Sequence, residues 1–133
     1  MTIIKSSEAE EDAVLIAAKL MAASARTAPK ARGVDRTLTM IVTGKEKEII
    51  AKAMEQKATQ KKNLAATFLR DAENVRKTST ILLIGVKGTV PKRPENPMNC
   101  GACGNAGCAD FIKAEKKTGE DFTGPICVLE AMD

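Results

Sequence analysis

The chain contains no histidine, tryptophan or tyrosine, and its only aromatic residues are three phenylalanines among 133 residues. Without histidine, the protein can have neither an imidazole general base nor a histidine-ligated metal. Without tryptophan and tyrosine, it lacks two of the platforms on which single-stranded bases stack. Apolar residues still make up 44% of the chain. This length and this composition predict a domain-sized fold with an aliphatic core.

The chain also has no strong excess of charge. Its 21 basic residues are interleaved with 17 acidic ones, which leaves a formal net charge of +4. Nucleic-acid binders usually concentrate their basic residues on one face. The densest basic runs here are pairs, Lys61 with Lys62 and Lys116 with Lys117. We therefore expect solvated helix faces and no nucleic-acid partner.

Targeting and membrane-spanning patterns are absent from the sequence as well. An acidic cluster follows the first residues closely, which is unlike a signal peptide. The apolar run 13–25 is interrupted by Lys19 and is too short to span a bilayer. These features predict a cytoplasmic protein without a membrane partner. In a reducing cytoplasm, clustered cysteines more often hold a metal or do redox chemistry than form structural disulfides.

The first half of the chain has helical and strand patterns. A capping-box pattern over 7–10 predicts a helix that runs to about Ala28, before Pro29, with a wide apolar face typical of a core helix. The basic loop 26–36 follows, and either a solvated loop or an anion-binding role fits its composition. Residues 37–43 then have the pattern of a strand.

Two more helices and a second strand are expected next. A second capping box over 43–46 precedes apolar positions at helical spacing, the pattern lapses at 60–63, and another helix covers about 64–75. The apolar run 81–86 reads as a central strand covered on both faces. Strand, helices and strand in this order predict an α/β fold with a small mixed or partly parallel sheet. We expect an α/β scaffold over 1–90 and a cysteine-rich segment over 91–133.

All four cysteines of the chain lie in that last segment. Cys100, Cys103, Cys108 and Cys127 form a C-x2-C-x4-C-x18-C array. Glycines at 101, 104 and 107 let the backbone curl around a metal centre, and a helix over 109–117 followed by Gly124-Pro125 would return the chain to Cys127. A [4Fe–4S] cluster needs four convergent thiolates. The array therefore predicts an iron–sulfur site.

Two other interpretations remain open for these cysteines. Structural zinc can be held by four cysteines, although they usually form two separated C-x2-C knuckles and this chain has one. A thioredoxin-type redox pair would need its C-x2-C at the start of a helix that follows a strand. That arrangement would leave Cys108 and Cys127 without a role.

The segment Asn-Cys-Gly-Ala-Cys-Gly-x3-Cys over 99–108 resembles the cluster segment of the corrinoid iron–sulfur protein. The chain further resembles a family of uncharacterised prokaryotic proteins that contain a ferredoxin-like domain. The matching stretches are 25–35, 68–76, 83–86 and the cysteine array with Gly124-Pro125. The resemblance implies four cluster ligands: Cys100, Cys103, Cys108 and Cys127. It also implies a further helical segment, rich in small residues, after Asp133.

The first half is also similar, more faintly, to the front of the nitroreductase fold. The shared features are a long helix, an Ala-Pro loop, a strand, a glycine-containing turn into a helix and a later apolar strand. This resemblance implies FMN bound across a homodimer interface. The acidic start of the first helix departs from the basic residues that contact the FMN phosphate in nitroreductases. Arg26, Lys30 and Arg32 are the candidate substitutes.

Taken together, the sequence predicts a [4Fe–4S] protein that transfers electrons between redox partner proteins. Its mildly cationic surface hints at an acidic partner. An FMN-dependent oxidoreductase with an accessory cluster is one alternative. A structural zinc protein with four cysteine ligands is the other.

Overall fold

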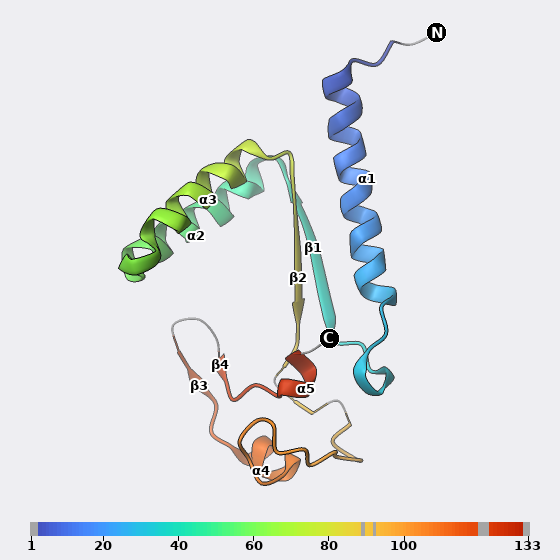
Figure 1. Cartoon of the computed structure of the whole chain (residues 1–133), viewed down its shortest axis with the longest axis vertical. Helices are drawn as coiled ribbons and strands as arrows, with labels where there is room; N and C mark the ends of the chain where they lie inside the picture. Colours follow the sequence, from blue (N-terminus) through green and yellow to red (C-terminus); the bar gives the residue numbers. More distant parts are fainter. Residues whose placement is uncertain (1–2, 89, 92, 120–122, 132–133) are drawn as a thin grey trace. The chain divides into compact units, whose positions relative to one another are not determined.

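The computed structural model describes residues 3–88, 90, 91, 93–119 and 123–131 and has the expected mixture of helices and strands (Figure 1). The helices are α1 (Ser6–Thr27), α2 (Lys47–Gln60), α3 (Ala65–Lys77), α4 (Cys108–Lys113) and α5 (Val128–Ala131). The strands are β1 (Thr37–Thr43), β2 (Thr80–Val86), β3 (Lys117–Thr118) and β4 (Thr123–Gly124). Short 3-10 turns cover Ala31–Gly33, Gly44–Glu46 and Lys62–Leu64. The expectation of an α/β protein is confirmed.

The chain divides into two compact units that interleave in sequence. The first contains Met1–Ser24 and Thr39–Leu83, and the second contains Ala25–Leu38 and Ile84–Asp133. The α2 and α3 helices belong to the first unit, whereas all four cysteines belong to the second. The two units are described separately below. The division of the chain into domains at residue 90 stays a prediction.

Both described sheets are two-stranded and antiparallel, so the prediction of a mixed or partly parallel sheet is wrong. β1 pairs with β2, and beyond their ends the backbone N–H of Lys87 donates to the carbonyl of Arg36 at 3.1 Å. β3 pairs with β4 in the register Lys117 to Gly124 and Thr118 to Thr123. Between β1 and β2 the chain forms two helices of nearly equal length. The second helix brings the chain back to where the first began, so β2 runs opposite to β1 (Figure 1).

The α2–α3 pair is held by small residues and one arginine. Ala51 of α2 and Ala72 of α3 are fully buried, which permits the two helices to approach closely. Near the end of α3, the Arg76 guanidinium donates to Glu48 Oε1 and Oε2, each at 2.9 Å, and to Glu55 Oε1 at 2.7 Å. These hydrogen bonds lower the pKa of both carboxyl groups and raise that of Arg76. The ion pairs of Arg76 with Glu48 and Glu55, which we call the Arg76 clamp, thus join α3 to α2.

The second capping box predicted at 43–46 is not formed. Thr43 makes no side-chain capping hydrogen bond, and Gly44 takes a left-handed backbone conformation with φ of 60°. Glycine adopts this conformation at little cost. The chain therefore passes through the 3-10 turn Gly44–Glu46, and α2 begins at Lys47.

Two predictions of burial are also wrong. α1 was expected to be a core helix, yet Ala18 is its buried residue while Ile16 and Leu20 are 57% and 66% exposed. The run in β2 was expected to be covered on both faces, yet Leu83 and Ile84 are exposed. An apolar run indicates that a segment favours a buried strand, whereas the burial of its two faces depends on the layers that pack against the sheet. Here the described sheet containing β2 has two strands.

The helix in the cysteine-rich segment is shorter than predicted. α4 ends at Lys113, because Ala114 takes a ψ of 138° and so leaves the helical conformation, and Lys117 already belongs to β3. The Phe111 ring is buried, with the Lys116 Nζ 4.8 Å from its centroid. The expected extended connection over 87–97 has neither helix nor strand at its described positions. Thr89, Lys92 and Phe122 lie outside the described residues.

None of the described helices combines the length and the apolarity that crossing a membrane requires.

Candidate metal centre

The loop from Asn99 to Cys108 carries three of the four cysteines and curls tightly. Its backbone takes left-handed conformations at Asn99, Gly101 and Gly104, with φ of 49°, 69° and 80°. Glycine is permissive there, and asparagine is among the few other residues that tolerate this region. The Gly104 N–H donates to the Gly101 carbonyl at 2.9 Å and closes a turn around Cys103. Of the three glycines singled out in the sequence, Gly101 and Gly104 therefore provide the left-handed conformations of the loop.

Asn99 joins the two ends of this loop. Its side-chain Oδ1 accepts a hydrogen bond from the backbone N–H of Cys108 at 2.9 Å, where α4 begins. A Cβ at Gly107 would lie 3.1 Å from the same oxygen, so glycine leaves room for the contact. Cys100 and Cys103 are held inside the span that this bond closes.

All four cysteines are free thiols in different environments. Cys100 is exposed, Cys103 and Cys108 are half-buried, and Cys127 is buried. The side-chain amide of Asn105 donates to the Cys103 sulfur at 3.4 Å. This hydrogen bond lowers the pKa of the Cys103 thiol, which favours the thiolate form that binds metals.

Cys127 lies on a separate segment that docks against Gly88. The Cys127 N–H donates to the Gly88 carbonyl at 2.8 Å, and the Cys127 carbonyl accepts from Glu130 at the start of α5. A Cβ at Gly88 would lie 2.6 Å from Cγ2 of Ile126. Only a residue without a side chain allows this approach. Gly88 thus sets the position of the fourth expected ligand.

Cys100, Cys103 and Cys108 share one loop, but they do not form a metal site among the residues that the structure describes. Within the described ranges, no group of three or more cysteine, aspartate and glutamate side chains is placed to hold a metal ion. The C-x2-C pair of Cys100 and Cys103 also does not lie at the start of a helix, as a thioredoxin-type pair would. Residues 97–100 are neither helix nor strand, and the helix begins only at Cys108.

Sequence reasoning missed Asn99 and Asn105. The signal available was asparagine within a glycine-rich loop, because asparagine tolerates left-handed backbone and bonds readily to nearby backbone groups. Asparagine is not a usual ligand of iron–sulfur clusters, so the cysteine spacing alone does not identify either residue.

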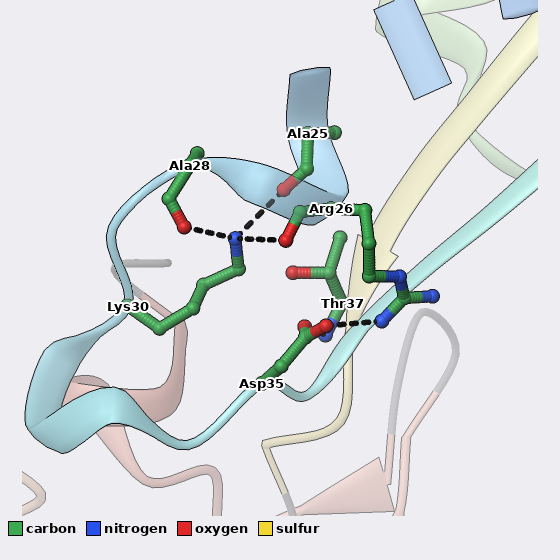
Figure 2. Close-up of polar contacts among 6 residues, drawn as sticks. All are labelled: Ala25, Arg26, Ala28, Lys30, Asp35 and Thr37. Atoms are coloured by element: carbon green, nitrogen blue, oxygen red, sulfur yellow. Dashed lines mark hydrogen bonds and ion pairs between the residues drawn. The ribbon is translucent and has the colours of Figure 1, made fainter. Parts of the chain in front are cut away.

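The basic loop also differs from the arrangement considered for a flavin phosphate. The Lys30 Nζ donates to the carbonyls of Ala25 and Ala28 at 2.7 Å each and to that of Arg26 at 3.4 Å, which caps the end of α1 (Figure 2). Arg32 has a left-handed φ of 58° and donates to the carbonyl of Asn96 at 2.5 Å. Two of the three candidate phosphate ligands therefore already bond to backbone carbonyls.

Fold and site together define a small α/β protein with a glycine-rich cysteine loop. No family model and no solved structure matches the chain. A protein of Archaeoglobus fulgidus described as "Uncharacterized protein" is 44% identical over 133 residues, an alignment that covers 98% of this chain and 67% of that protein. The chain belongs to the same family as this archaeal protein and spans about two thirds of its length.

Proposed function

We propose that the protein binds a [4Fe–4S] cluster through Cys100, Cys103, Cys108 and Cys127 and transfers electrons between redox partner proteins. The observation that carries the proposal is the hydrogen bond from the Cys108 N–H to Asn99 Oδ1, which folds three free thiols into one glycine-rich loop. Such a loop is the type of scaffold on which closely spaced cysteines hold iron–sulfur clusters.

The donor set fits a cluster by its chemistry. It offers four thiols in a chain without histidine, and thiolates are the ligands that iron–sulfur clusters take. The thiols are not assembled among the described residues. Metal sites in small domains commonly order only when the metal binds, since binding free energy then drives the folding of the site. The proposal therefore includes closure of the loop and of the Cys127 segment on binding.

In this proposal the residues around the thiols hold and orient the ligands. Asn105 donates to the Cys103 sulfur, and hydrogen bonds of this kind tune the reduction potential of a cluster. The cluster, when bound, supplies one-electron transfer. The exposed position of Cys100 would bring one edge of the site near a docked partner. The net charge of +4 favours an acidic partner, and free thiols suit a reducing cytoplasm.

The alternatives predict different bound species. A structural zinc protein would use the same four thiols without sulfide. An FMN-dependent oxidoreductase would contain flavin and form a homodimer. Because Lys30 and Arg32 already bond to backbone carbonyls, the structure lends that alternative little support.

Anaerobic purification of the full chain followed by iron, zinc, acid-labile sulfide and flavin analysis tests the proposal. We expect iron and sulfide in equal amounts, with the broad visible absorption of an iron–sulfur cluster. Zinc without iron would replace the proposal by the structural alternative. Stoichiometric flavin would shift it to the oxidoreductase.

A further inference from the structure

A cavity of about 500 Å³ opens beside the start of β1, within the second compact unit. It lies apart in sequence from the cysteine loop and contains none of its residues. The lining residues are Arg26, Val34, Asp35, Arg36, Thr37, Leu38 and Lys87. The volume falls in the range of small-molecule sites. Figure 2 shows Arg26, Asp35 and Thr37 close together beside the end of α1.

Three cationic side chains and one carboxylate line the cavity. Arg26 donates through one Nη to Asp35, which neutralises the carboxylate and leaves other guanidinium N–H groups as donors. The Nε of Arg36 lies 3.7 Å from the buried carboxylate of Glu130. Lys87 forms no ion pair with any residue that the structure describes. Its ammonium therefore supplies the uncompensated positive charge.

Backbone pairing places Arg36 and Lys87 side by side, whereas Arg26 comes from the last turn of α1. The Lys87 N–H donates to the carbonyl of Arg36 at 3.1 Å, which continues the β1–β2 ladder to the mouth of the cavity. The Asp35 carboxylate accepts a hydrogen bond from the Thr37 N–H at 2.8 Å and so fixes the start of β1. Arg36 and Lys87 therefore stand at one fixed end of the β1–β2 ladder.

Thr37 adds an independent observation that points to a ligand. It lines the cavity, it is only 5% exposed, and its Oγ1 is buried without a hydrogen-bond partner among the described residues. The Thr37 side chain also makes a minor contribution to the lowered pKa of Asp35. A buried hydroxyl without a partner is unfavourable by about 1–3 kcal/mol, so such groups usually serve a ligand or an ordered water.

We propose that this cavity binds the phosphate group of a small phosphorylated molecule, with Lys87, Arg26 and Arg36 facing the charge and the Thr37 hydroxyl donating to a phosphate oxygen. Two guanidinium groups favour an oxyanion that accepts several hydrogen bonds, such as a phosphate group, over a halide. The cavity is much larger than an isolated phosphate, so the rest of the ligand has space beside it. The site is independent of any metal bound by the cysteines.

Binding of inorganic phosphate and pyrophosphate to the full chain, measured by calorimetry and by thermal unfolding, tests this site. Chloride at matched ionic strength controls for screening, and succinate controls for a generic dianion. We expect both phosphate compounds to bind and to raise the Tm above the chloride control. No effect beyond chloride would overturn the proposal, and tighter binding of succinate would overturn the choice of phosphate.

Two variants and one control sharpen the test. Lys87→Gln should weaken pyrophosphate binding at least about tenfold, whereas Lys5→Gln, at an exposed position of the other unit, should not. Thr37→Val should weaken binding by about tenfold while changing the ligand-free Tm little, since the hydroxyl makes no hydrogen bond that meets the usual distance and angle limits with any described residue. Wild-type affinity in both variants would contradict the assignment. A Thr37→Val protein that is destabilised without ligand would show that the hydroxyl has a structural role instead.

Discussion

The side-chain oxygen of Asn99 accepts a hydrogen bond from the backbone N–H of Cys108 at 2.9 Å, across nine residues. This contact makes a loop out of the segment that contains Cys100 and Cys103. It also places the left-handed backbone of Asn99 at the entrance and the first turn of α4 at the exit. The geometry of three proposed ligands therefore depends on a residue that binds no metal.

Replacing Asn99 with alanine should open the loop. The variant loses one exposed hydrogen bond, which typically contributes about 1 kcal/mol or less to stability. It also puts a residue less suited than asparagine at a φ of 49°. We expect severalfold less iron retained after anaerobic reconstitution and dialysis. Asn96→Ala is the matched control, because the Asn96 carbonyl and not its side chain contacts Arg32. Equal iron retention in both variants would show that Asn99 does not position the proposed cluster ligands.

Gly88→Ala should displace the Cys127 segment. The new Cβ would lie 2.6 Å from Cγ2 of Ile126, a β-branched side chain with little freedom to move away. Overpacking of this kind typically costs about 1–3 kcal/mol. We expect a lower Tm and a lower cluster content. Gly85→Ala is the control, since nothing lies within 4 Å of a Cβ there. If the two variants behave alike, Gly88 does not position Cys127.

Acid should weaken the loop that precedes β1. The hydrogen bond from Arg26, and then that from the Thr37 N–H, lower the pKa of Asp35 from its ordinary value of 3.8 to about 2. A carboxyl group with a lowered pKa stabilises the fold above its unfolded pKa, and this contribution disappears as the pH falls from about 4 to about 2. Carboxyl NMR titration should place the pKa of Asp35 well below its ordinary value of 3.8. An Asp35 pKa near 4 would show that the pair with Arg26 is not formed in solution.

The Arg76 clamp should stabilise the α2–α3 pair. Arg76→Met keeps the apolar stem but removes the hydrogen bonds to Glu48 and Glu55, so we expect the Tm to fall by a few degrees. The pKa of both glutamates should rise toward its ordinary value, because Arg76 is the main cause of its lowering. Arg70→Met serves as the control, since Arg70 is exposed and pairs, among the described residues, with its sequence neighbour Asp71. Unchanged glutamate titration in Arg76→Met would rule the clamp out.

Local pattern was enough to predict most of the elements. The strand at 37–43 and the helical break near 60–63 coincide with β1 and with the turn before α3, because alternation and 3.6-residue periodicity are properties of the segment itself. The capping box at Thr43 was not formed, because Gly44 takes a left-handed conformation that delays the helix. Turn geometry decided that boundary.

Tertiary features were less accessible from the sequence. The antiparallel pairing of β1 with β2 depends on two helices of similar length returning the chain, which no single segment encodes. Likewise, cysteine spacing could predict the metal ligands but not the role of Asn99 or of Gly88, since those contacts span distant parts of the segment. The cavity at Thr37 unites residues about fifty positions apart, so its lining could be seen only in three dimensions.

The most direct test of the central claim is the iron and sulfide content per chain after anaerobic reconstitution, measured for the wild type and for Cys108→Ser. The account predicts about four iron and four sulfide ions per wild-type chain, with the visible absorption of a [4Fe–4S] cluster, and a clear loss of both in the variant. A wild-type chain that takes up zinc and no iron would contradict it, as would a variant with undiminished iron and sulfide.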